Sequence, residues 1–161
     1  MAEYVAGLEN NLRQQIAFYR QLTELEQEKQ KALVDNVIEK IESITAQEEK
    51  ILLEVGQLEE ERLYWADFFG RETNKNIEDI TLADLSSSFP ALQSVRLELE
   101  SVIGELKSLH EVNTQLLENA VKLVNFTVRL LTNDRQATYS NPGDKANKSH
   151  QTGVKIIDKS I

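Results

Sequence analysis

Side chains that ligate metals or act as nucleophiles are scarce in this 161-residue chain. Cysteine is absent, which excludes disulfides, thiolate metal sites and cysteine nucleophiles. The two histidines, His110 and His150, are far apart in the chain, and neither has a glutamate three residues before it, as a helical di-metal site requires. The six glycines are isolated, so the chain has no glycine-rich phosphate loop. We therefore expect neither a metal nor a cofactor.

Carboxylates are the abundant reactive group, with 27 Asp and Glu against 18 Lys and Arg. Adjacent acidic residues such as Glu48-Glu49 and Glu59-Glu60-Glu61 fall in segments with helical apolar spacing, where they typically form the solvated face. We therefore predict no catalytic carboxylate pair and expect that the protein is not an enzyme. The net charge of −9 also argues against a nucleic-acid partner, because phosphate contacts need a basic surface.

The charge is distributed unevenly along the chain. Residues 134–161 contain five basic and three acidic residues, a net of +2, whereas residues 1–133 contain 13 basic and 24 acidic residues, a net of −11. The N-terminal Met-Ala-Glu-Tyr-Val has neither the basic nor the apolar region of a secretory signal, and no apolar run approaches the length of a membrane span. These features predict a cytoplasmic protein.

The first 33 residues have the apolar spacing of an amphipathic helix. Apolar residues recur every three or four positions, at Val5, Leu8, Leu12, Ile16, Tyr19, Leu22 and Leu25. This stripe weakens over residues 27–31, and Asp35 or Asn36 is suited to cap a second helix. We predict a first helix over residues 3–33 and a turn at 33–36. A single continuous helix over residues 3–69 is the alternative.

The second predicted helix, residues 36–69, carries a heptad seam. Its members step by four and three: Val37, Ile41, Ile44, Glu48, Ile51, Val55, Leu58, Arg62, Trp65 and Phe69. Ile38, Leu52 and Leu53 widen the apolar stripe, which predicts packing on two neighbours. Gly70 follows the aromatic residues at the end of the seam and is expected to stop the helix.

Residues 70–89 are predicted to form a linker, in which Thr81 and Asp84 resemble a short capping box before Leu82 and Leu85. Pro90 then opens a third helix over residues 90–132. Its seam also steps by three and four: Leu92, Val95, Leu99, Val102, Leu106, Leu109, Asn113, Leu116, Ala120, Leu123, Thr127 and Leu130. At 1.5 Å per residue this would be the longest of the three helices.

Three long helices with short connections predict an all-α fold, an antiparallel three-helix coiled-coil bundle with a long third helix. Residues 1–133 would form this helical domain. Residues 134–161 are rich in polar residues, Gly and Lys, and we expect a disordered C-terminal tail there.

The last third of the third helix is apolar on more than one side, which exceeds what one bundle seam needs. This surface either pairs two copies of the chain or binds an amphipathic helix of another protein. Asn113 in the seam has two readings as well. It either fixes the helix register or contacts the backbone of a partner.

Two sets of residues resemble the FlgN family, the cytoplasmic chaperones of the flagellar hook–filament junction proteins. In the second helix these are Glu48-Glu49-Lys50-Ile51-Leu52-Leu53, Leu58-Glu59 and Arg62. From the third helix onward they are Leu109, Asn113, Leu116-Leu117-Glu118, Asn125, Leu130-Leu131, Tyr139 and Gly143. The basic tail with Lys155-Ile156-Ile157 is also similar. One departure is Ser140, where the family usually has Gly after the tyrosine.

The resemblance implies a flagellar type III export chaperone. Such a chaperone covers amphipathic terminal helices of hook-associated proteins, prevents their premature self-association and delivers them to the export apparatus at the membrane. It implies client binding by nine residues: Val112, Asn113, Leu116, Leu117, Ala120, Val121, Val124, Val128 and Leu131. Tyr139 would dock at the export gate. In the absence of client, the chaperone could form a homodimer. A structural scaffold or adaptor that oligomerises through its third helix is the alternative function.

Overall fold

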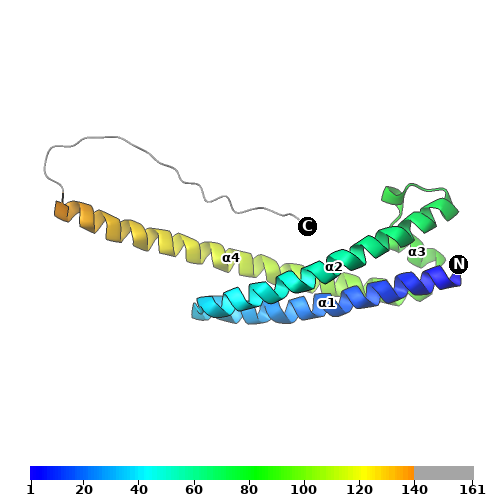
Figure 1. Ribbon diagram of the computed structural model, residues 1–161, viewed down its shortest axis with the longest axis horizontal. Coiled ribbons are helices and arrows are strands. Elements are labelled where there is room, and N and C mark those ends of the chain that lie inside the picture. The colour runs from blue at the N-terminus through cyan, green and yellow to red at the C-terminus, as the bar shows by residue number, and fades with distance from the viewer. Residues whose placement is uncertain (140–161) are drawn as a thin grey trace. The chain divides into compact units, whose positions relative to one another are not determined.

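The computed structural model describes the backbone of residues 1–139 and the side-chain environments of residues 1–132. Over this part of the chain every regular element is a helix. The long helices are α1 (Ala2–Asp35), α2 (Ile38–Thr73) and α4 (Ala91–Tyr139), and a 3₁₀ turn η1 (Ile77–Asp79) and a short helix α3 (Leu82–Ser88) precede α4 (Figure 1). The predicted all-α class is confirmed.

The helices α1 and α2 are separate elements that pack side by side (Figure 1). Asn36 ends α1 in the left-handed conformation, with φ 55°, and its N–H donates to the carbonyl of Ala32. The single continuous helix is therefore excluded. The predicted N-cap role of Asn36 is wrong, because Asn36 caps the end of α1 and Val37 precedes α2. Asparagine tolerates positive φ better than most residues, which explains its place in this turn.

The end of α2 differs from the prediction. Gly70 does not stop the helix, which runs one turn further to Thr73 and ends at Asn74 with φ 51°. The carbonyl of Gly70 accepts from the N–H groups of Asn74 and Lys75, and a Cβ at position 70 would lie 3.1 Å from the carbonyl oxygen of Lys75. The glycine therefore allows the chain to fold back closely against the helix end, and the positive φ falls on Asn74 instead.

The linker contains the predicted capping box. The N–H of Asp84 donates to the hydroxyl of Thr81, and the N–H of Thr81 donates to the carboxylate of Asp84. Leu85 of this short helix α3 is buried in the core with Val5 and Leu8 of α1. The bonds to Thr81 also lower the pKa of Asp84.

The structure divides into two units, residues 1–121 and residues 122–161, and the boundary falls within α4. In the first unit α1 and α2 are antiparallel, because Asn11 bonds to Leu58 while Lys29 bonds to Glu48. The first part of α4 follows α1 in the same direction, because Arg20 pairs with Glu98 and Glu26 with Asn113. All the side chains of the core cluster belong to this unit: Val5, Leu8, Leu12, Ile16, Phe69, Leu85, Leu92, Val95 and Val102.

The residues that the sequence suggested for packing α2 on a second neighbour do not make that contact. Ile38, Leu52 and Leu53 are exposed. Instead the contact is made by Phe69, which is fully buried with Leu92 and Val95 of α4 and lies against Phe89. Near the end of α2, this large aromatic ring fills the space beside the start of α4.

The third long helix is longer than predicted, since α4 continues to Tyr139 instead of ending at residue 132. No glycine or proline occurs between Gly104 and Pro142, so no backbone-breaking residue stops the helix at 132. The start of the predicted tail, residues 134–139, is therefore helical. The rest of the predicted tail, residues 140–161, lies outside the described residues.

Candidate client-binding surface

The inner seam of α4 is the series of positions that steps by three and four from Leu92 to Leu130. Up to Ala120, its members are buried or half-buried in the first unit: Leu92, Val95, Leu99, Val102, Leu106, Leu109, Asn113, Leu116 and Ala120. Leu92 and Val95 are fully buried. In this part of α4 the apolar stripe packs against the rest of the first unit, as in an amphipathic helix of a bundle.

From Val121 to Leu131 the apolar side chains of α4 are exposed. The exposed fractions run from 47% for Val121 to 66% for Leu123, and the set also contains Val124, Phe126, Val128, Leu130 and Leu131. Single exposed apolar residues are common, but a contiguous run of seven in one helix is typical of a surface that binds another protein.

The nine residues implied in client binding fall into three groups. Six are exposed: Val112, Leu117, Val121, Val124, Val128 and Leu131. Leu116 and Ala120 are half-buried members of the inner seam. Asn113 is buried, and its amide donates to the backbone carbonyl and the carboxylate of Glu26 at 2.7 and 2.5 Å. Asn113 therefore contacts α1 and is not available to a client in this conformation.

Asn113 belongs to a polar cluster that joins all three long helices. Glu26 of α1, with a side chain only 6% exposed, accepts from Asn113 and lies 2.9 Å from Nδ1 of His110. Lys29 of α1 lies 3.5 Å from Glu26 and 2.6 Å from Glu48 of α2. The cluster places polar partners at one level of three mainly apolar seams, which favours the register reading of Asn113.

The two carboxylates of this polar cluster differ in pKa. Burial alone would raise the pKa of Glu26, but hydrogen bonds from His110 and Asn113 and the charge of Lys29 outweigh it, so the pKa lies below its usual value. Burial raises the pKa of Glu48, and its single partner Lys29 offsets this only in part. Oε1 of Glu48 is buried without a hydrogen-bond partner among the described residues.

The sequence carried a signal for this polar cluster. Glu26, Lys29 and Leu33 continue the spacing of the α1 stripe after Leu22, by steps of four, three and four. Reading the stripe by register instead of by apolarity would have placed Glu26 and Lys29 on the inner face. Glu48 and Asn113 likewise occupy polar positions in the predicted seams of the second and third helices. Their pairing with Lys29 and Glu26 could not be predicted, because nothing local links positions so distant in the chain.

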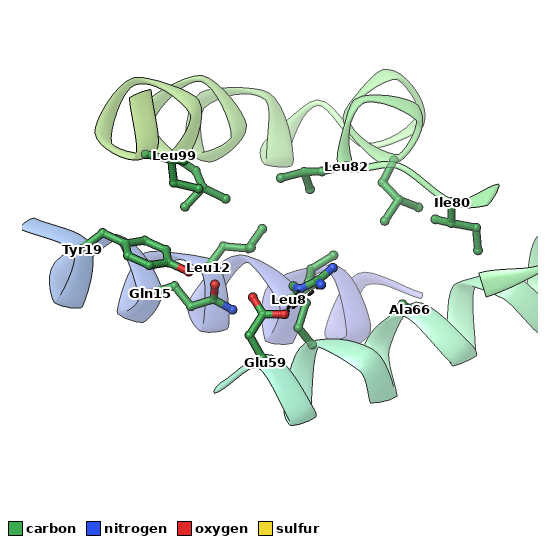
Figure 2. A pocket seen from close by; sticks show the side chains of 12 residues that line it. Leu8, Leu12, Gln15, Tyr19, Glu59, Ala66, Ile80, Leu82 and Leu99 are labelled. Atoms are coloured by element: carbon green, nitrogen blue, oxygen red, sulfur yellow. Dashed lines mark hydrogen bonds and ion pairs between the residues drawn. The ribbon is translucent and has the colours of Figure 1, made fainter. Parts of the chain in front are cut away.

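A cleft of about 250 Å³ is lined by side chains of α1, α2, α3 and α4 (Figure 2). Leu8 and Leu12 of α1 face Leu82 and Leu99 across it. Its polar lining includes Glu59 and Arg62, which bond to each other at 2.8 Å. Burial and the nearby Glu59 raise the pKa of Tyr19 at the same end. Leu8, Leu12 and Leu85 of this lining belong to the core cluster, so the cleft is a groove in the packing of the helices.

Two kinds of feature are absent from the described residues. No group of three or more His, Asp or Glu side chains there is arranged to hold a metal ion. In that same part of the chain, no helix combines the length and the apolar character needed to cross a membrane.

Comparison with known proteins places the chain in a family. The family model described as FlgN protein matches residues 1–147. The uncharacterized protein YvyG of Bacillus subtilis (strain 168) is 23% identical over 148 residues, which cover 91% of this chain and 92% of that protein. No solved structure matches. Since the family model spans nearly the whole chain, including the exposed face of α4, the protein belongs to the FlgN family, a family of flagellar export chaperones.

Proposed function

We propose that this protein is a cytoplasmic chaperone of flagellar type III export that binds amphipathic terminal helices of hook–filament junction proteins. It covers the apolar faces of these helices, prevents their premature self-association and delivers them to the export apparatus. Residues 1–133 act as a three-helix coiled-coil domain, and the third helix supplies the binding face. The family membership and the exposed apolar surface of α4 support this function.

The observation that carries the proposal is the exposure of Leu117, Val121, Val124, Val128 and Leu131. They step by four, three, four and three, so they lie along one face of the helix. This is the spacing with which a helix receives another amphipathic helix. Of the other predicted residues, Leu116 and Ala120 belong to the half-buried inner seam and Val112 is exposed off this row. We leave Asn113 out because its amide is bonded to Glu26.

Binding of this kind suits a chaperone that must release its client. The client segment loses conformational freedom when it binds, and this cost keeps the affinity modest for the area buried. We propose that Tyr139, the last residue of α4, takes part in docking at the export gate. The variant Tyr139→Ala should then keep client binding in vitro and lower the amount of junction protein exported by cells. Unchanged export would remove this role.

The test of the proposed function is the double variant Leu117→Asp and Val124→Asp, mixed with a junction protein from the same genome. Both side chains are about half exposed or more, so we expect helix content and the melting temperature to stay near those of the unchanged protein. We expect the stoichiometric complex seen by size-exclusion chromatography with light scattering to disappear.

Two results would contradict the proposal. If the double variant unfolds, these residues belong to the core and the binding assignment is wrong. If the unchanged protein forms no complex and is instead a salt-insensitive homo-oligomer, the apolar face is already covered by a second copy. The scaffold function would then replace the chaperone function.

A further inference from the structure

The exposed segment of α4 carries two apolar seams and not one. The inner seam continues through Leu123, Thr127 and Leu130, in the same register as the buried positions before it. A second series, the outer seam, consists of Leu117, Val121, Val124, Val128 and Leu131. Within residues 122–131 each seam has at least two large apolar side chains, and all of them are more than half exposed.

The two seams face different directions. Leu123 and Val124 are adjacent in sequence, as are Leu130 and Leu131, and adjacent residues on an α-helix are separated by about 100° around its axis. One straight partner helix packs along one seam, because its side chains fill a single row of holes. Two seams about 100° apart correspond to two neighbouring helices, as at a corner of a four-helix bundle.

The outer seam begins at Leu117, close to Ala120, the last inner-seam residue that is still half-buried. The positions that would extend the outer seam backward are Thr114, His110 and Lys107, which are polar. Over that stretch the inner seam is buried or half-buried against the first unit. Beyond Val121 both seams are apolar and both are exposed. The inner seam there continues an interface that the same helix already makes, which indicates that it too receives a helix.

We propose that this segment of α4 receives two amphipathic helical segments of one client, one along each seam. The inference rests on the proposed function and deepens it by stating what the client must supply. A second copy of this chain fits less well, because α4 packed against α4 closes one seam of each copy and leaves the other open. The proposal of two client helices also assigns a binding role to Leu123 and Leu130, which were not among the predicted site residues.

The test uses three double variants that each add two negative charges to exposed positions of α4. The inner-seam variant is Leu123→Asp with Leu130→Asp, and the outer-seam variant is Val124→Asp with Val128→Asp. The control, Ser108→Asp with Gln115→Asp, changes two exposed polar residues on the side of the helix away from both seams. Binding of a junction protein is measured by titration calorimetry, and hydrogen exchange of the client is measured in each complex.

If the client binds through two helical segments, affinity and hydrogen exchange should change in a definite pattern. Both seam variants should weaken binding at least about tenfold, which is about 1.4 kcal/mol, and the control should stay within about twofold. Hydrogen exchange should show two protected client segments with the unchanged protein, and each seam variant should lose protection of a different one.

The alternative outcomes separate this inference from the proposed function. If only the outer-seam variant weakens binding and a single client segment is protected, the client uses one helix. The two-seam inference then fails while the chaperone function stands. If the unchanged protein binds no junction protein, both fail. If it binds with two protected segments but neither seam variant weakens binding, the surface of α4 is not the site.

Discussion

At the scale of single residues, the polar cluster of Glu26, Lys29, Glu48, His110 and Asn113 holds two carboxylates with opposite behaviour. Glu26 is supplied with donors from α4 and by Lys29, so its ionised form is favoured in the folded protein. Within the described part of the chain, Glu48 has one donor, Lys29, and one buried oxygen without a partner, and burial disfavours its ionised form. Neutralising Glu26 should therefore change the free energy of unfolding differently from neutralising Glu48.

We predict that Glu26→Gln lowers the free energy of unfolding at neutral pH by about 2 kcal/mol, because an amide presents its own N–H groups to the donors of Asn113 and His110. Glu48→Gln is the matched control. It removes a buried charge that is incompletely paired and leaves Lys29 near Glu26, so the free energy of unfolding should stay unchanged or rise. Urea unfolding followed by circular dichroism measures both, and equal losses in the two variants would contradict this account.

The effect of Glu26→Gln should depend on pH. The pKa of Glu26 is lower in the folded than in the unfolded protein, so its ionised form contributes stability above the unfolded pKa. That contribution is lost as the pH falls through the folded pKa. The difference between Glu26→Gln and the unchanged protein should therefore be full at neutral pH and shrink toward zero below the folded pKa. A difference that stays constant with pH would show that the charge of Glu26 is not its cause.

At the scale of elements, α1 and α2 approach each other closely where Gly7 faces the ring of Trp65. A Cβ at position 7 would lie 2.7 Å from two ring atoms of Trp65, closer than such contacts allow. Tyr4 stacks on Phe68 one turn away, with ring centroids 3.5 Å apart. The aromatic residues at the end of α2 therefore pack on α1 through a position without a side chain.

We predict different effects for two glycine variants in these helices. Gly56→Ala should raise the free energy of unfolding by about 1 kcal/mol, because the position is helical and open space surrounds it. Gly7→Ala gains the same helix propensity but displaces the Trp65 ring, an overpacking cost of about 1–3 kcal/mol. Gly7→Ala should thus be less stable than Gly56→Ala in thermal and urea unfolding. Equal stabilisation by both would mean that Trp65 moves without cost.

At the scale of the whole molecule, the core and most of the proposed binding face lie in different parts of α4. The first unit contains the core cluster, and the apolar residues of α4 beyond it are exposed. A chaperone benefits from this division because its binding face can change in sequence without loss of the fold. The division also explains why one helix shows two kinds of apolar pattern, a single buried seam followed by two exposed ones.

Two valines of α4 test this division. Val95 is fully buried, so Val95→Ala should lower the free energy of unfolding by about 2 kcal/mol through the lost burial and the cavity left behind. Val128 is more than half exposed, so Val128→Ala should change it by less than about 0.5 kcal/mol. Equal losses by urea unfolding would show that Val128 is buried in solution and that the apolar face is already covered.

The sequence by itself determined the helical class, the stripes of all three long helices and the capping box of α3, because all of these depend on residues within a few positions of one another. The resemblance drawn from short motifs also led to the right family. The bounds were less accurate, at Gly70 and at residue 132, because glycine does not always end a helix and polar residues do not prevent one.

Only the tertiary structure decided which members of each stripe are covered. It paired Asn113 and His110 with Glu26 and Lys29 with Glu48, and it left Ile38, Leu52 and Leu53 exposed. Local periodicity fixes the face on which a side chain lies, but its partner depends on how far each helix slides and tilts against the next. That placement results from packing among residues 19 to 87 positions apart.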